Sequence, residues 1–197
     1  MIKFENVSVT YPGGVEALKD LNLEIKDGDF IIIVGLSGAG KSTLLRTVNN
    51  LVKPSTGSVY LEGKNVTSAK KKELKKIRSQ IGMIFQTFNL VNRSTVLKNV
   101  LTGRLSNIST IRSILGLWPK DQKEMAFEAL NQVEILEKAY VRASNLSGGQ
   151  QQRVGIARAL SQKPKVMLAD EPVASLDPIT SRVVMSYLKK INTELGI

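Results

Sequence analysis

Alternating and continuous apolar runs along the chain predict two different kinds of β-strand. In residues 17–25, the apolar positions Leu21, Leu23 and Ile25 alternate with polar ones, which predicts an antiparallel strand with one wet face. Other runs are apolar throughout, as is typical of strands buried on both faces of a parallel α/β sheet. These runs are residues 30–34, 81–85 and 165–169. The pattern therefore indicates an α/β core with an antiparallel portion.

From about Phe88 to Leu160 the pattern becomes mostly helical. Within residues 121–133 the apolar positions recur at helical spacing, and we expect Asp121 to cap this helix, with Glu124 three residues further on. Its apolar residues are Met125, Ala129, Leu130 and Val133. Residues 106–120 predict a loop. We expect a single domain, with residues 1–87 and 161–197 forming the α/β core and antiparallel subdomain, and residues 88–160 forming an inserted helical subdomain.

Composition narrows the classes of function. The 197 residues carry a net charge of +11, which favours contact with an anionic nucleotide, nucleic acid or lipid surface. The absence of cysteine excludes disulfides and thiolate–metal sites. The longest apolar stretch is too short to span a bilayer, and the N-terminus lacks the apolar block of a signal peptide. We interpret the basic run of residues 70–78 as a solvated helix face, because no aromatic residues interleave with it as in single-strand binders.

The sequence "GLSGAGKS" from Gly35 to Ser42 has the spacing G-x-x-x-x-G-K-[ST] of a phosphate-binding loop. Gly38 and Gly40 permit the backbone angles that point N–H groups at phosphate oxygens, and Lys41 adds a cation. The Ser42 hydroxyl is suited to bind Mg²⁺. The residues expected to contact ATP in this loop are Gly35, Leu36, Ser37, Gly38, Ala39, Gly40, Lys41, Ser42 and Thr43.

A second candidate element is the acidic pair that ends the apolar run 166–169. Asp170 is placed to hold Mg²⁺, and Glu171 is placed to polarise an attacking water. An Asp-Glu pair alone is more often an ordinary strand end. Behind an apolar strand in a chain that also has a phosphate-binding loop, the catalytic interpretation is favoured, with Glu171 and Lys41 as catalytic residues.

The stretch "LSGGQ" from Leu146 to Gln150 completes a pattern that resembles the ATP-binding subunits of ABC transporters over essentially the whole chain. The resemblance implies a P-loop NTPase fold with a RecA-like α/β core, an antiparallel β subdomain and an inserted helical subdomain. It also implies that Tyr11 stacks on adenine and that Gln86 is the Q-loop glutamine near the metal. The D-loop residues implied are Ser175, Leu176 and Asp177.

The same resemblance explains why one chain has two glycine-containing turns. In the family two subunits pair head to tail, and the signature of one contacts the γ-phosphate held by the P-loop of the other. The signature residues implied are Leu146, Ser147, Gly148, Gly149 and Gln150. The implied partners are a second copy, integral membrane permease subunits and, indirectly, an extracytoplasmic solute-binding protein, with no nucleic acid. The implied location is peripheral, on the cytoplasmic face of the cell (inner) membrane, with ATP and Mg²⁺ bound.

A finer resemblance, through "ADEPVASLDP" and "RSILGLW", is to the phosphonate-import members. The alternatives are an importer ATPase for another small solute, a soluble ABC ATPase acting on nucleic acid, or a fragment that binds nucleotide without turnover. Tyr11 could be a strand-end aromatic, Gln86 a surface residue, and Asp177 a helix cap. The chain contains no histidine, whereas family members continue with a strand and a switch histidine. We therefore expect a C-terminally incomplete chain that hydrolyses ATP poorly and aggregates.

Overall fold

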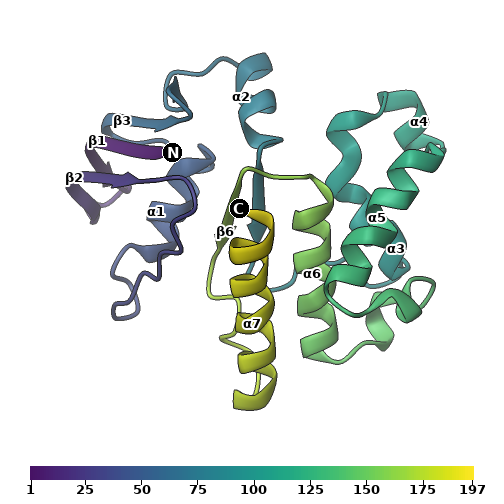
Figure 1. Ribbon diagram of the computed structural model, residues 1–197. Helices are drawn as coiled ribbons and strands as arrows, with labels where there is room; N and C mark the ends of the chain where they lie inside the picture. Colours follow the sequence, from purple (N-terminus) through teal and green to yellow (C-terminus); the bar gives the residue numbers. More distant parts are fainter. The chain divides into compact units, whose positions relative to one another are not determined.

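The computed structural model describes residues 1–197, which form two units (Figure 1). The first unit contains residues 1–78 and 192–197, and the second contains residues 79–191. No helix in either unit combines the length and apolar character needed to cross a bilayer.

The first unit is built on a four-stranded antiparallel sheet. Its strands are β1 (Ile2–Thr10), β2 (Glu16–Ile25), β3 (Thr56–Leu61) and β4 (Lys64–Asn65), in the order β2-β1-β3-β4. Ile2 pairs with Ile25 on one side and with Leu61 on the other. The alternation predicted for residues 17–25 is confirmed, because the apolar positions are half-buried while the polar ones are exposed. The antiparallel part of the fold is thus fixed by period-two patterning.

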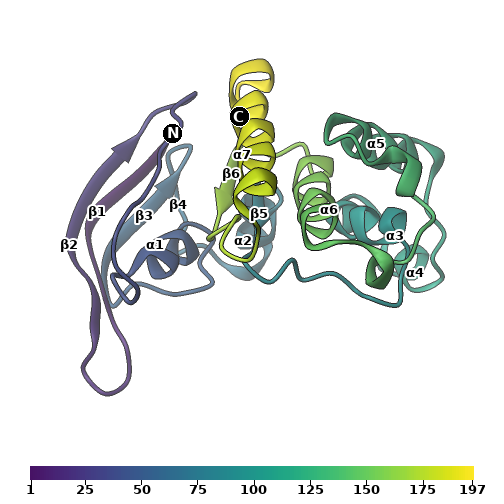
Figure 2. The same ribbon diagram turned by 90° about the horizontal axis from the view of Figure 1, so that it is seen from below.

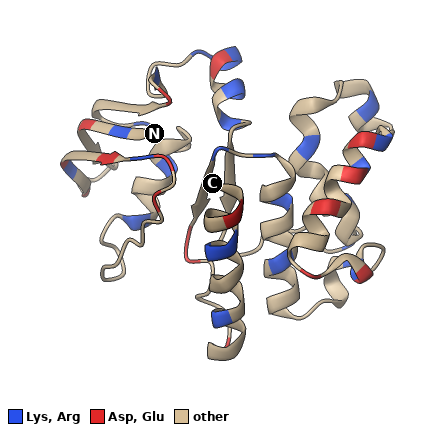
Figure 3. Cartoon of the chain, viewed as in Figure 1, with Lys and Arg blue, Asp and Glu red and all other residues tan.

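Two helices belong to this unit. Helix α1 (Lys41–Val48) contacts β2 and β3, and buries Thr47 and Val48. Helix α2 (Lys71–Arg78) has only Ile77 buried, and its lysines, coloured blue in Figure 3, are exposed. The interpretation of the basic run as a solvated helix face is therefore confirmed. Arg78 closes the helix by donating to the carbonyl oxygens of Asn49 and Asn50 at 2.8 and 2.9 Å.

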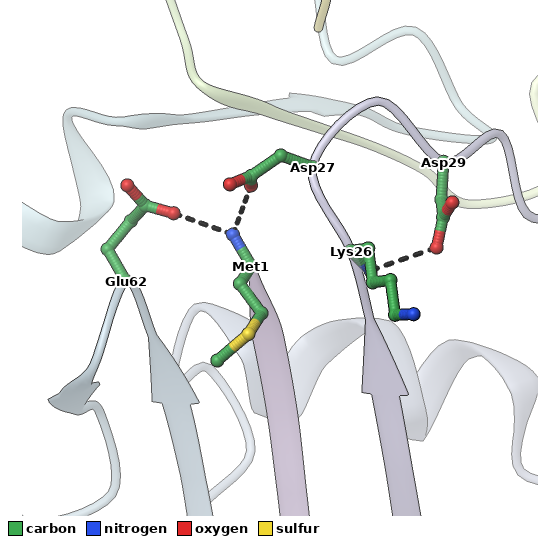
Figure 4. Close-up of polar contacts among 5 residues, drawn as sticks. All are labelled: Met1, Lys26, Asp27, Asp29 and Glu62. Atoms are coloured by element: carbon green, nitrogen blue, oxygen red, sulfur yellow. Dashed lines mark hydrogen bonds and ion pairs between the residues drawn. The ribbon is translucent and has the colours of Figure 1, made fainter.

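Carboxylates gather at the end of the sheet where the chain begins (Figure 4). The α-amino group of Met1 donates hydrogen bonds to Asp27, and to Glu62 at 2.6 Å. Burial lowers the pKa of this amine, but the two carboxylates more than offset that effect, so the pKa is raised. Nearby, the backbone N–H of Lys26 donates to the Asp29 carboxylate at 2.9 Å and forms the turn after β2.

The prediction of a buried strand over residues 30–34 is wrong. These residues form no β-ladder, and all of them are exposed, with Ile32 at 64% and Val34 at 88%. An apolar run predicts that the segment is buried. A strand also needs a neighbouring strand whose backbone N–H and C=O groups can hydrogen-bond to those of the segment. No strand in the chain pairs with this segment, which leads directly into the glycine loop.

The other two apolar runs form the parallel pair that was predicted. Strands β5 (Ile81–Ile84) and β6 (Val166–Ala169) lie in register, from Ile81 opposite Val166 to Ile84 opposite Ala169. All four residues of β5 are buried. The two carboxyl ends therefore lie at the same edge of this small sheet.

Helices make up most of the second unit, and residues 86–165 contain no strand (Figure 2). The elements are α3 (Val96–Leu101), η1 (Thr102–Asn107), α4 (Thr110–Ile114), α5 (Lys120–Gln132), η2 (Leu136–Lys138), η3 (Ala143–Asn145), α6 (Gly148–Ser161) and α7 (Pro178–Leu195). Helix α6 packs against α3, α5 and β5.

The loop predicted for residues 106–120 is wrong in part, because the segment contains α4. The Asp121 cap is also wrong: the N-cap residue of α5 is Pro119, two residues earlier, so Asp121 lies within the first turn.

A buried guanidinium joins three helical elements of this unit. Arg104 in η1 donates to the Gln122 side chain of α5 at 2.8 Å and to the Ser161 carbonyl of α6 at 2.7 Å. Burial lowers the pKa of Arg104, while Asp121 opposes that effect. Because a buried donor without partners is costly, these bonds specify how η1, α5 and α6 pack together.

Candidate functional site

The glycine loop of the first unit has the backbone shape that its spacing predicts. Gly38 and Gly40 adopt φ angles of +81° and +82°, in the left-handed region that favours glycine. At Gly40 the space is restricted as well, since a Cβ there would fall inside 3.0 Å of the Ala17 carbonyl oxygen in β2. The expectation that these two glycines supply unusual angles is confirmed. Gly40 is also the N-cap residue of α1.

The Lys41 side chain turns back over this loop. Its ammonium group donates to the carbonyl oxygens of Gly35 and Leu36, each at 2.9 Å. Residues 35–39 are exposed, and a Cβ on Gly38 would meet nothing within 4 Å. No side chain caps the start of α1. The loop thus presents an exposed backbone, a cation and the positive end of a helix, which together can bind a chain of phosphates.

Tyr11 lies beside the end of this loop. Its hydroxyl shares a hydrogen bond of 3.1 Å with the hydroxyl of Thr43, in the first turn of α1. A tight turn holds the residue there, because the backbone N–H of Tyr11 donates to the Val15 carbonyl at 2.9 Å. The ring stays 38% exposed and available to a flat ligand. The structure brings Tyr11 next to the loop, while its contact with adenine stays a prediction.

The second unit carries the acidic pair at the shared edge of β5 and β6. The backbone N–H of Asp170 donates to the Ile84 carbonyl at 3.0 Å, so the parallel ladder continues up to the first acidic residue. Gln86 follows the end of β5 by two residues and is exposed at the same edge. Asp170 is buried, with 4% of its surface exposed, whereas Glu171 is exposed. Strand pairing therefore brings Gln86, Asp170 and Glu171 together.

Glu171 has an unusual backbone. Its φ of +49° lies in the left-handed region, which is uncommon for residues other than glycine. Its carbonyl accepts from the N–H of Ala174 at 3.2 Å, closing a turn directly after the strand. Such conformations cost free energy and cluster at functional sites. The turn gives Glu171 an exposed carboxylate immediately after a buried one.

The donor set fits a magnesium ion only in combination with a ligand. No three side chains of His, Cys, Asp or Glu gather anywhere in the chain to hold a metal by themselves. The residues that the sequence predicts as metal ligands, Ser42, Gln86 and Asp170, each offer an oxygen atom. Mg²⁺ prefers oxygen donors and is commonly held by one or two carboxylates together with substrate phosphates. The residues present match that preference.

The signature turn starts α6 with side-chain caps. The Ser147 hydroxyl accepts from the N–H of Gln150 at 3.4 Å, and the Gln150 side chain accepts from the N–H of Ser147 at 3.0 Å. This reciprocal capping box fixes the first turn. Ser147 and Gly148 are exposed, while Leu146 is buried beneath them. The helix begins at Gly148, and the turn offers backbone N–H groups but no cationic side chain.

The segment after Glu171 also ends in a capped helix. One carboxylate oxygen of Asp177 accepts from the N–H groups of Ile179 and Thr180, each at 3.0 Å, and Pro178 occupies the first helical position of α7. Hydrogen bonding, first from the Thr180 hydroxyl and then from these backbone groups, lowers the pKa of Asp177. The alternative interpretation of Asp177, as a helix cap, is confirmed, while its D-loop role stays a prediction.

Sequence reasoning missed the contact that holds the segment after Gln86. Phe88 and Asn89 both adopt left-handed angles, with φ of +48° and +51°. Arg158 of α6 donates to the carbonyl oxygens of both residues, at 2.9 Å to Phe88. Burial lowers the pKa of this guanidinium. The available signal was a single arginine inside the apolar stretch "VGIARAL", which we interpreted only as helix.

The comparisons with known proteins agree with this geometry. Residues 18–174 match the ABC transporter family. The phosphonates import ATP-binding protein PhnC of Bacillus thuringiensis subsp. konkukian is 60% identical over 197 residues, which cover 100% of the chain and 77% of that protein. PhnC 3 of Halalkalibacterium halodurans is 56% identical over 194 residues, covering 98% of the chain and 75% of that protein.

Solved structures extend the likeness to the whole fold. The dimeric, post-hydrolysis ATP-binding cassette MJ0796 bound to ADP and Pi superposes with a TM-score of 0.86 at 40% identity, covering 100% of this chain and 84% of that one. The ADP conformation of the cassette MJ1267 gives a TM-score of 0.85 at 30% identity, covering 100% and 78%. The chain therefore has the P-loop NTPase fold of an ATP-binding cassette and belongs to the ABC transporter family.

Proposed function

We propose that the chain is the ATP-binding and ATP-hydrolysing subunit of an importer whose cargo is a phosphonate. The observation that carries the nucleotide part is the open loop of residues 35–40, with left-handed glycines and the Lys41 ammonium held over it. The cargo part rests on relatives that are named phosphonates import ATP-binding proteins and are up to 60% identical. The cargo itself passes through separate membrane subunits, so no residue here needs to contact it.

In this proposal the loop residues bind the α-, β- and γ-phosphates through backbone N–H groups, and Lys41 pairs with the β/γ charge. Tyr11 stacks on the adenine. Ser42, Gln86 and Asp170 hold Mg²⁺, which would neutralise developing charge on the phosphates. Glu171 accepts the proton of the attacking water, for which its exposed carboxylate beside the buried Asp170 is suited.

Two copies of the chain pair head to tail in this proposal. The turn places the exposed residues Ser147 and Gly148 and the half-buried Gly149 at a helix start, which suits a γ-phosphate held by the other copy. The turn has no cation of its own, so it completes a site rather than forming one. A related cassette with ADP and Pi is itself dimeric.

The further organisation is also part of the proposal. The core of residues 1–87 and 161–197 binds the nucleotide, and the helical subdomain of residues 88–160 carries the signature. The pair binds integral permease subunits at the cytoplasmic face of the cell membrane, and a solute-binding protein acts on the opposite side.

The proposal is tested in two steps. MgATP binding to the purified chain should be saturable and should weaken strongly in Lys41→Ala, which retains the fold. Cells lacking their own cassette should regain growth on an alkylphosphonate as sole phosphorus source when this protein and its neighbouring permease are supplied. MgATP binding without growth would contradict the phosphonate cargo and indicate an ATPase for another solute. The absence of MgATP binding would contradict the proposed nucleotide site.

A further inference from the structure

The two signature glycines lie against the D-loop region of the same chain. A Cβ on Gly148 would meet Leu176 at 3.5 Å, an ordinary van der Waals contact. A Cβ on Gly149 would fall inside 3.0 Å of the Thr180 Cγ2 methyl, a separation that real Cβ atoms essentially never show. Gly149 does not adopt a positive φ, so its conformation does not require glycine. The tight contact with Thr180 gives the physical reason for glycine at this position.

Thr180 lies at the start of α7, the helix that Asp177 caps. The Asp177 carboxylate accepts from the backbone N–H groups of Ile179 and Thr180 at 3.0 Å each. Thr180 is β-branched, and such side chains are stiff about χ1 in a helix. The capped backbone and the branched side chain together hold a methyl against the start of α6.

We propose that Thr180 is a positioning residue that seats the signature turn on the D-loop helix of its own chain. The contact packs the start of α6, which carries Ser147, against the start of α7, which Asp177 caps, so a displacement of one turn acts on the other. Packed side chains without free space transmit such displacements because they resist deformation. The contact itself stands on the geometry, while its effect on turnover rests on the proposed function.

Substitutions at Thr180 separate the methyl from the hydroxyl. Thr180→Ser removes the Cγ2 methyl and keeps the hydroxyl, which opens space for a Cβ on residue 149. Thr180→Val keeps a methyl at that position and loses the hydroxyl. If the methyl is the obstacle, Gly149→Ala is rescued by Thr180→Ser and not by Thr180→Val.

The experiment compares the full chain with Gly149→Ala, with both double variants and with Thr180→Ser alone. Hydrogen exchange of the Gln150 and Gln151 amides reports the first turn of α6 and needs no ATP. Gly149→Ala should speed this exchange roughly tenfold, as overpacking does, and the added Thr180→Ser should return it to within about threefold of the wild type. Gly148→Ala is the matched control: its Cβ would make only an ordinary contact with Leu176, so its exchange should stay near that of the wild type with or without Thr180→Ser.

The kinetics of ATP hydrolysis provide a second measurement, because a residue with a merely structural role would not change kcat separately from KM. Phosphate release should fall in Gly149→Ala with an unchanged KM for ATP, because the P-loop is intact, and Thr180→Ser should restore kcat. Exchange or kcat that fails to recover in the Gly149→Ala/Thr180→Ser protein would overturn the inference. If the wild type releases no phosphate, the proposed function has failed and amide exchange alone decides whether Thr180 seats the turn.

Discussion

The P-loop region and the acidic and signature region of this protein reach their shapes by different means. Residues 35–41 are shaped by two left-handed glycines and by a lysine that bonds the carbonyls of its own loop. The acidic pair instead follows two strands that pair in parallel. The signature and D-loop turns begin helices that are capped by the side chains of Ser147 and Asp177.

This difference bears on what each region can do alone. The P-loop has a cation and an open backbone, so it can hold a phosphate chain without help from neighbouring elements. The signature turn has neither cation nor left-handed glycine, and its serine already caps its own helix. It is therefore suited to contact a phosphate that is bound elsewhere.

The largest effect is expected at Glu171. Glu171→Gln keeps the shape of the side chain and removes its basicity, so phosphate release should fall by about 10²–10⁴-fold. ATP binding should persist because the P-loop is unchanged, and ATP-bound dimers should accumulate in size-exclusion chromatography. Normal hydrolysis by this variant would remove Glu171 as the base.

The apolar runs before the phosphate-binding loop and before the acidic pair should differ in how much an introduced lysine lowers the free energy of unfolding. Leu168→Lys places a charge inside the β5–β6 pair and should lower the free energy of unfolding by about 3–5 kcal/mol. Ile32→Lys alters an exposed residue and should change it by less than about 0.5 kcal/mol. Urea denaturation of both variants measures the difference. A large loss in Ile32→Lys would show that residues 30–34 are buried in solution.

ATP binding to monomers should distinguish the two glycine turns. Lys41→Ala removes a charged donor to phosphate and should weaken binding by about 10- to 100-fold. Ser147→Arg is the matched control: it should leave monomer binding within about twofold, because the signature does not hold its own chain's nucleotide. Equal losses in the two variants, measured by titration calorimetry, would contradict the division of roles.

The smallest effect concerns the D-loop cap. The pKa of Asp177 is lowered in the folded chain, so its contribution to stability is present above its ordinary value of about 4 and is lost as pH falls through the lowered value. The difference in unfolding free energy between the wild type and Asp177→Ala should therefore shrink below about pH 4. A difference that is constant from pH 6 to pH 2 would show that the cap does not depend on the charge.

Sequence patterns predicted those elements whose partners lie within the chain. β5 and β6 were recognised because both are apolar throughout and each supplies the other's hydrogen bonds. Residues 30–34 have the same composition but no such neighbour, and composition alone cannot provide one. Asp121 looked like a cap, yet the helix begins at Lys120 after Pro119, because propensity does not fix the first turn.

The candidate site shows the same limit. Fixed spacings located the P-loop, the acidic pair and the signature, since their chemistry depends on local order. The contacts of Arg158 with Phe88 and Asn89, and of Thr180 with Gly149, join residues far apart in sequence. Such contacts depend on tertiary packing, and the spacing of residues along the sequence does not predict them.

The central claim is that the signature of one chain completes the P-loop of another, and mixing two damaged chains tests it most directly. Ser147→Arg and Lys41→Ala subunits should each fail to form ATP-dependent dimers alone. Their heterodimer has one site with both motifs intact and one with both altered, so the mixture should pair on addition of ATP, as measured by analytical ultracentrifugation. A mixture that pairs no better than either variant alone would contradict the claim.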